Sequence, residues 1–208
     1  MKDNAIIITV FFIGCLVGWS GIAPEAIKEN NPAIYILYAL MFQVGISIGS
    51  DKNLKTMVKS LRLKMLLLPL STILGTLLFS ALISIVLTRW TVFDCLAVGS
   101  GFAYYSLSSI LITELKGASL GVQVAAELGT IALLANIMRE MMALLGTPLL
   151  ARFFGRFAPI SAAGVNSMDV ILPTITKYTG KAMNTFAIFH GILVDMSVPF
   201  FVTLFCTL

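Results

Sequence analysis

Four long stretches of the chain contain no Asp, Glu, Lys or Arg. They extend from Asn4 to Pro24, from Asn30 to Ser50, from Met65 to Thr88 and from Cys95 to Thr113. At a rise of about 1.5 Å per residue, a helix of about 20 residues matches the ~30 Å hydrocarbon core of a bilayer. The stretches are rich in Ile, Leu, Val and Phe and lack the strict alternation of a barrel strand. The pattern therefore predicts an all-α, polytopic bundle of membrane-spanning helices.

Composition supports the bilayer as the solvent. The 208 residues are 58% hydrophobic and 12% charged, with a mean hydropathy of +0.97, whereas soluble domains carry about 25% charged residues. No phosphate-binding loop, basic-aromatic tract or long soluble segment occurs, which excludes nucleic-acid binding and ATP-driven transport within this chain. Cys15, Cys95 and Cys206 lack metal-ligand spacing and are expected to be buried thiols. Neither a metal nor a cofactor is expected.

The residues that flank the uncharged stretches predict a topology. The stretch from Asp51 to Lys64 is the only strongly basic one, so the positive-inside rule places it in the cytoplasm, together with the N-terminus. Arg89 and Trp90 are expected to anchor the outer end of the third helix. The N-terminal stretch is predicted to be a membrane helix rather than a cleaved signal, because Lys2 is offset by Asp3 and no A-x-A site follows.

The fourth stretch contains the string GSGFAYYSLSS, from Gly99 to Ser109, at mid-membrane depth. Gly99 and Gly101 weaken a helix, and several serines bring hydroxyl groups to this depth. One interpretation is a seam of small residues where two helices pack closely. The other is an interrupted helix whose freed backbone groups line a polar cavity.

Charged residues occur within apolar segments of the second half of the chain, where an ionised group costs several kcal/mol unless it faces a cavity or a partner. Asn136, Arg139 and Glu140 stand at i, i+3 and i+4, so the amide shares a helix face with both charges. They predict either a helix end at the interface or a buried substrate or proton site. Arg139 and Glu140 point about 100° apart, so each is expected to have its partner elsewhere. Glu127 faces the opposite side and is expected at an entrance or interface.

Two aspartates share a local pattern, since each lies four residues before a proline, as DVILP from Asp169 and DMSVP from Asp195. A proline at this spacing cannot donate to the carbonyl of the aspartate, so a helix there is expected to kink or break. An acid beside a free carbonyl favours a cation-related role. His190 is off the face of Asp195, and it is interpreted either as a proton-relay member or as a packed histidine.

Four ordered motifs make the sequence similar to a known family. The chain resembles the LysO family of bacterial lysine exporters across roughly Ile6 to the C-terminus. The motifs are GSGFAYYSLSSILITE (Gly99 to Glu114), LLANIMREMMALL (Leu133 to Leu145), GVNSMDVILPTI (Gly164 to Ile175) and HGILVDMSVPF (His190 to Phe200). The string YALMFQVGIS, from Tyr38 to Ser47, also looks like the family's helix before the cytoplasmic loop.

The resemblance implies a non-enzymatic, multi-pass protein of the bacterial inner membrane that exports L-lysine and analogues such as thialysine. By position in the motifs, it assigns substrate or proton binding first to Glu140, then to neighbouring and hydroxyl-bearing positions. These further positions are Asn136, Arg139, Asp169, Asp195, Tyr105, Ser106 and Ser108.

Single-chain relatives have an additional N-terminal part of about three membrane helices. The resemblance therefore implies that residues 1–208 form a single transmembrane transporter domain corresponding to the C-terminal part of such an exporter. A small, separately encoded membrane subunit is then expected as a partner. The bundle is expected to have about five or six transmembrane helices with discontinuous or re-entrant segments.

Lysine carries two ammonium groups and one carboxylate, so its site needs at least two acceptors and one positive or N–H donor group. Glu140 and Asp169 are expected to bind the ammonium groups. Arg139, or a half-helix N-terminus near Gly101 or Gly164, is expected to bind the carboxylate. Exchange of a proton for an amino group on an acid predicts lysine/proton antiport by alternating access. The sequence leaves Na⁺ coupling and a homodimer open.

Three alternatives remain at this stage. The first is a transporter or channel for another small cationic solute. The second is a membrane-embedded hydrolase that uses Ser106 or Ser108 with His190 and Asp195, although neither serine lies in G-x-S-x-G. The third is a scaffold subunit that does not transport.

Overall fold

A computed structural model describes residues 63–208 and a few isolated earlier positions: Ile13, Leu16, Val17, Ser20, Ala39, Phe42 and Ile46. The chain divides into two units, Met1–Gln43 and Val44–Leu208. The described positions of the first unit are helical. Most of the first two predicted helices and the basic loop after Asp51 lie outside the described residues, and so do Cys15 and the N-terminal positions. The fold below is that of residues 63–208.

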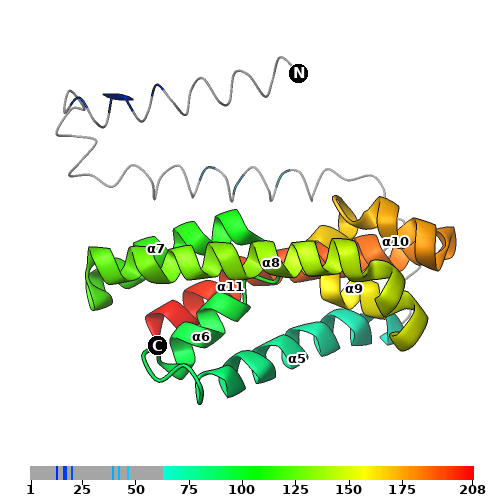
Figure 1. Cartoon of the computed structure of the whole chain (residues 1–208), viewed down its shortest axis with the longest axis horizontal. Coiled ribbons are helices and arrows are strands. Elements are labelled where there is room, and N and C mark those ends of the chain that lie inside the picture. The colour runs from blue at the N-terminus through cyan, green and yellow to red at the C-terminus, as the bar shows by residue number, and fades with distance from the viewer. Residues whose placement is uncertain are drawn as a thin grey trace. The chain divides into compact units, whose positions relative to one another are not determined.

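Residues 63–208 contain helices and no strand, which confirms the all-α class for this part of the chain (Figure 1). In chain order the elements are η1 (Leu63–Leu66), α5 (Leu67–Ile83), α6 (Val92–Gly99), α7 (Tyr105–Leu120), α8 (Val122–Phe154), α9 (Ala158–Ala163), η2 (Gly164–Met168), α10 (Leu172–Thr179), η3 (Lys181–Met183) and α11 (Asn184–Thr207).

Two of these helical segments, Val122–Phe154 and Lys181–Thr207, are long and apolar enough to cross a membrane by length and composition. α5 is shorter than the predicted third helix, because the chain leaves the helix after Ile83 and continues in turns to Thr91. The number of membrane spans in the whole chain stays a prediction.

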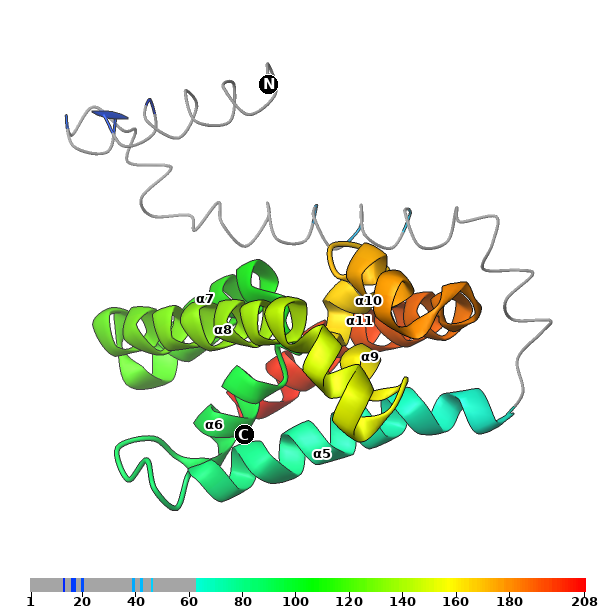
Figure 2. The same ribbon diagram turned by 45° about the vertical axis from the view of Figure 1, so that its right-hand side comes forward.

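α6 and α7 form a hairpin, here called the first hairpin (residues 92–120). α6 begins with a capping box in which Thr91 and Asp94 bond each other's backbone N–H groups. The chain leaves the helix at residues 100–104, where Phe102 and Ala103 adopt positive φ values of 45° and 74°, a conformation that a right-handed helix excludes. α7 then runs in the reverse direction and packs along α8 (Figures 1 and 2).

The ends of the first hairpin confirm the reversal. The Nζ atom of Lys116, near the end of α7, lies 3.1 Å from Oδ1 of Asp94, near the start of α6. A straight helix would separate these residues by about 30 Å. The prediction of a single span from Cys95 to Thr113 is therefore wrong, whereas the predicted interruption of the helix within GSGFAYYSLSS is present.

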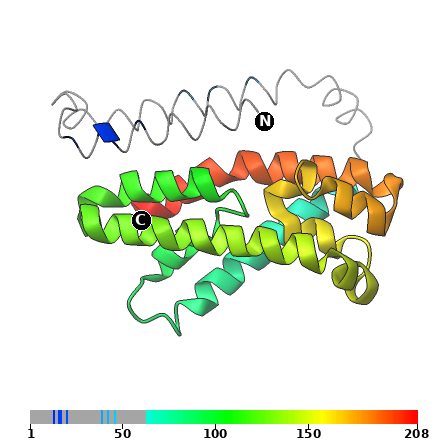
Figure 3. The same ribbon diagram turned by 45° about the horizontal axis from the view of Figure 1, so that its top comes forward.

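A second hairpin (residues 158–179) consists of α9, η2 and α10 and lies at the opposite end of α8 (Figures 1 and 3). Its apolar side chains form one cluster with α8 and α11, which includes Ala143, Ile160, Ile175 and Ala187. α9 and α10 lie on either side of η2 within the bundle, and whether residues 161–176 cross the bilayer or re-enter from one side stays a prediction.

α8 and α11 run the length of the bundle and connect the two hairpins. α7 packs closely on α8 at Gly129, where a β-carbon would overlap Oγ1 of Thr113 and lie 2.9 Å from the carbonyl oxygen of Ser109. Phe102 of the first hairpin packs edge-on against Phe201 of α11, with ring centroids 6.4 Å apart. Near the middle of α8, Asn136 bonds Ala103 of the first hairpin and Arg139 bonds Ala162 of the second.

Candidate functional site

The tips of the two hairpins touch each other. The backbone N–H of Val165 donates to the carbonyl oxygen of Phe102 over 3.0 Å, and Nδ2 of Asn166 donates to the carbonyl oxygen of Ala103 over 3.4 Å. Gly164 has a φ of +60°, and a β-carbon there would overlap the Phe102 carbonyl oxygen. Glycine therefore permits both the backbone conformation and the close approach.

Asn136 of α8 holds the tip of the first hairpin. Its side chain accepts the N–H of Ala103 at 2.8 Å and donates to the carbonyl oxygens of Ala132 and Val98 at 2.9 and 3.2 Å. The residue is 3% exposed, so these bonds satisfy an amide that has little access to water. The predicted site residue Asn136 thus lies at the tip, with its hydrogen-bonding groups occupied by the protein.

Three hydroxyl-bearing residues predicted for the site follow the first tip and divide into two groups. Ser108 is buried, and its hydroxyl donates to the carbonyl oxygen of Tyr104 at 2.8 Å. Tyr105 and Ser106 are exposed at the start of α7. Of the three, only Tyr105 and Ser106 therefore lie on the surface of the described part.

Arg139 ties α8 to the second hairpin and to α5. Its guanidinium donates to the carbonyl oxygens of Ala162 and Ser161 at 3.1 and 3.2 Å and to Oγ1 of Thr76 at 3.2 Å. It also lies over the ring of Phe102, 5.9 Å from the centroid. Ser161 and Ala162 are in the last turn of α9, where helix carbonyls lack partners and carry partial negative charge. Arg139 therefore caps this helix, and its partners are carbonyls and a hydroxyl rather than a carboxylate within residues 63–208.

The two glutamates of α8 have different surroundings. Glu127 is exposed and pairs with Arg89 across 2.6 Å at the end of the bundle where the first hairpin begins. Glu140 is partly exposed, and its carboxylate forms no hydrogen bond or ion pair with another described residue. No contact within residues 63–208 joins Glu140 to Asp169, so their joint binding of lysine stays a prediction.

Asp169 and Asp195 lie near each other and near Tyr104. The two carboxylates are close enough to interact electrostatically, and both also act on the phenol of Tyr104. Asp169 follows η2 and is exposed, whereas Asp195 of α11 is 5% exposed. These three residues, from the first tip, the turn after η2 and α11, are here called the acidic site: Tyr104, Asp169 and Asp195.

The prolines after these aspartates act differently from the prediction. Pro173 lies in the first turn of α10, and the carbonyl oxygen of Asp169 accepts the N–H of Leu172 at 3.2 Å. α11 continues from Asn184 to Thr207 with Pro199 inside it. The expected free carbonyl at Asp169 is therefore wrong, because Leu172, one residue before Pro173, donates the N–H that the proline lacks. α11 does not break near Asp195, and a kink there stays a prediction.

His190 connects the second tip to α5. It is fully buried, with Nδ1 3.1 Å from Oγ of Ser167 and Nε2 3.0 Å from Oγ1 of Thr72. The proposed hydrolytic triad is not assembled within the described residues, since His190 contacts neither Ser106 nor Ser108. No group of three His, Cys, Asp or Glu residues in the described part could hold a metal ion.

The sequence pattern does not single out Tyr104 or the buried pair of Asp94 and Lys116. The string T-x-x-D at Thr91 is a capping signal that could have placed the start of α6. The contact with Lys116 could be recognised only after the reversal of the hairpin was known, since the two residues lie on either side of the uncharged fourth stretch. Tyr104 is adjacent to the predicted Tyr105, and the turn at the tip decides which of the two faces the acids.

A family model described as the lysine exporter LysO matches residues 8–206. The chain belongs to the LysO family. The lysine exporter LysO of Escherichia coli (strain K12) is 30% identical over 201 residues, which cover 94% of this chain and 62% of that protein. A putative lysine exporter of Haemophilus influenzae is 27% identical over 203 residues, which cover 96% of each. This LysO-family chain thus spans less than two thirds of the E. coli relative. No solved structure gives a significant match.

Proposed function

We propose that the chain is the hairpin-bearing part of a secondary transporter that exports L-lysine, and analogues such as thialysine, across the bacterial inner membrane. The main support for this proposal is the pair of opposed hairpins, whose tips are hydrogen-bonded to each other and lie near Asp169 and Asp195. Irregular backbone at membrane depth is tolerated where protein or a cavity satisfies its polar groups, and transporters place their substrate sites at such interruptions. The names of both relatives support lysine as the substrate.

The opposed hairpins suggest how access alternates. α7 of the first hairpin is joined to the N-terminal end of α8, and α9 of the second hairpin is joined to its C-terminal end. A movement that opens one hairpin relative to α8 and α11 would admit solute from one side of the membrane, while the other hairpin keeps the opposite side closed. The hydrogen bonds between Val165 and Phe102 and between Asn166 and Ala103 hold the tips together in the conformation described above.

The acidic site supplies a chemical basis for recognising lysine and for coupling to protons. Asp169 and Asp195 provide two carboxylates for ammonium groups, and the Tyr104 hydroxyl provides a further hydrogen-bonding group. Two neighbouring carboxylates are unfavourable when both are charged and unoccupied. Binding of an ammonium group or of a proton relieves this repulsion, so that one replaces the other, which gives lysine/proton antiport. Glu140 adds a carboxylate on α8, four residues after Asn136.

Lysine flux into proteoliposomes with an imposed pH gradient tests the proposal. The chain is reconstituted alone and together with the segment that corresponds to the remaining part of the E. coli relative. We expect flux that follows the gradient, a loss of at least about tenfold in Asp195→Asn, and little change in the matched surface variant Glu127→Gln. Lysine flux that is independent of the pH gradient would refute proton coupling but not export. No lysine flux in either preparation would refute export. Native mass spectrometry of the two preparations tests a homodimer and a membrane partner subunit.

A further inference from the structure

A cavity of about 210 Å³ lies between α5, α6 and α8, separate from the acidic site. Trp90, Asp94 and Cys95 line one end, and Asn136 and Arg139 line the other. The walls between them are mostly aliphatic. Pockets for drug-sized ligands measure roughly 300–1,000 Å³, so this cavity suits one small solute. It leads from the end of the bundle that carries Arg89 and Trp90 toward the hairpin tips.

Arg139 supplies a positive charge with spare hydrogen-bonding capacity at the inner end. A guanidinium has five N–H donors, and three of them bond Ala162, Ser161 and Thr76. Two donors therefore remain, and no carboxylate within residues 63–208 forms an ion pair with this group. A guanidinium held rigidly by other bonds is well suited to bind a carboxylate, because little further entropy is lost on binding.

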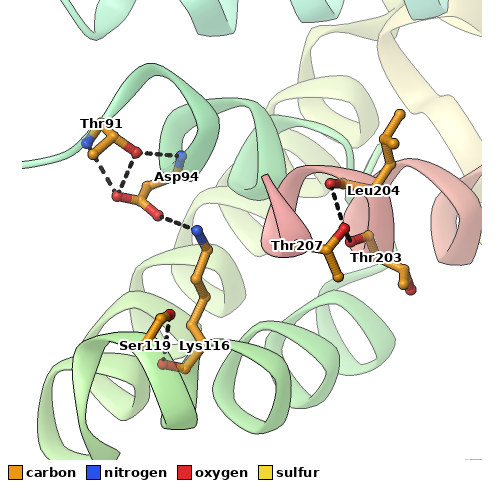
Figure 4. Close-up of polar contacts among 7 residues, drawn as sticks. All are labelled: Thr91, Asp94, Lys116, Ser119, Thr203, Leu204 and Thr207. Atoms are coloured by element: carbon orange, nitrogen blue, oxygen red, sulfur yellow. Dashed lines mark hydrogen bonds and ion pairs between the residues drawn. The ribbon is translucent and has the colours of Figure 1, made fainter.

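Asp94 supplies a carboxylate at the outer end, and an ammonium group already occupies it (Figure 4). Thr91 holds Oδ2 of Asp94 through its hydroxyl at 2.7 Å and its N–H at 3.0 Å, which leaves Oδ1 for Lys116 at 3.1 Å. The side chains of Lys116 and Asp94 are 9% and 3% exposed. The partner in this buried pair is the ammonium of a lysine side chain, the same group that free lysine carries.

We infer that the cavity is a second binding site for L-lysine, at which the free amino acid competes with Lys116. The carboxylate of the ligand pairs with Arg139, its aliphatic chain lies along the apolar walls, and its side-chain ammonium replaces that of Lys116 on Asp94. The inference rests on the proposed function for the identity of the ligand. This second site is distinct from the acidic site at the tips, since neither Asp169 nor Asp195 lines the cavity.

Protection of Cys95 from a small methanethiosulfonate reagent tests the site, because this thiol lines the cavity. The assay uses membranes that hold the full chain with Cys15→Ser and Cys206→Ser. L-Lysine at about ten times its dissociation constant should slow labelling about tenfold. Norleucine, which lacks the side-chain ammonium, and cadaverine, which lacks the carboxylate, should protect much less. Ala135→Cys, an exposed position lining the same cavity, replaces Cys95 as the reporter if the buried thiol reacts too slowly.

The Lys116→Met variant tests the competition directly. Without the tethered ammonium, free lysine should protect Cys95 at a lower concentration than in the parent and should raise the melting temperature of the variant more than that of the parent. Asp195→Asn serves as the control, and protection should persist in it because the acidic site is separate. Equal protection by norleucine, or protection that is lost in Asp195→Asn, would overturn the cavity site. Lysine flux without any protection would also overturn it while leaving export intact, and protection without flux would refute export alone.

Discussion

Substitution of Gly164 by alanine tests the contact between the hairpin tips. Gly164 has φ +60° and ψ −129°, a conformation that costs an L-residue about 1–3 kcal/mol. The new β-carbon would overlap the carbonyl oxygen of Phe102 and lie 3.0 Å from its carbonyl carbon. The tips must then separate, which breaks the Val165–Phe102 hydrogen bond at a cost of about 0.5–1.5 kcal/mol. Overpacking adds about 1–3 kcal/mol.

Gly180→Ala is the matched control. Gly180 also has a positive φ, +91°, but no atom lies within 4 Å of the position that a β-carbon would occupy. The control should therefore show only the backbone strain, and Gly164→Ala should cost about 2–4 kcal/mol more. At about 2–4 °C per kcal/mol, its melting temperature in detergent, followed by circular dichroism, should be lower than that of the control by at least about 4 °C. Equal stability of the two variants would show that the tips are not in contact.

Further substitutions test individual contacts through the free energy of unfolding. Asn136→Leu should destabilise the chain by about 1–3 kcal/mol, because the buried N–H of Ala103 loses its acceptor. A smaller effect would show that Asn136 does not hold the first tip. Asp94→Asn and Lys116→Met should each cost about 3–5 kcal/mol, and the double variant should cost less than their sum; additivity would contradict the buried pair. Glu127→Gln should cost under about 1 kcal/mol, since the side chains of Arg89 and Glu127 are 63% and 43% exposed; a larger loss would show that this pair is not a surface contact.

The interruption of the helix at Gly99–Ser109 could be predicted from the sequence, whereas the reversal of the chain could not. Two glycines and several serines indicate weak helical propensity, which is a local property. The direction after the break depends on contacts between distant residues, such as Lys116 with Asp94 and Val165 with Phe102. Hydropathy alone therefore assigned one span to a segment that folds back on itself.

The acids of the site could be named from the sequence, but not paired. Their rarity in apolar segments singled out Glu140, Asp169 and Asp195. Helix geometry relates residues only within one regular element, and these three lie in different elements. The structure brings Asp169 near Asp195, and it assigns to Arg139 a capping role that depends on where α9 ends. Neither result follows from spacing along the chain.

The sidedness of four introduced cysteines tests most directly whether the hairpins enter from opposite sides of the membrane. Thr88→Cys and Ser119→Cys flank the first hairpin, and Arg156→Cys and Lys181→Cys flank the second, each in a background with the native cysteines replaced by serine. An impermeant maleimide applied to intact cells and to inverted vesicles reports the side of each thiol. We expect the first two thiols to be labelled from one side of the membrane and the last two from the other. Labelling of positions 88 and 119 from opposite sides would show that the segment between them crosses the membrane once, which would contradict a hairpin that enters and leaves on one side.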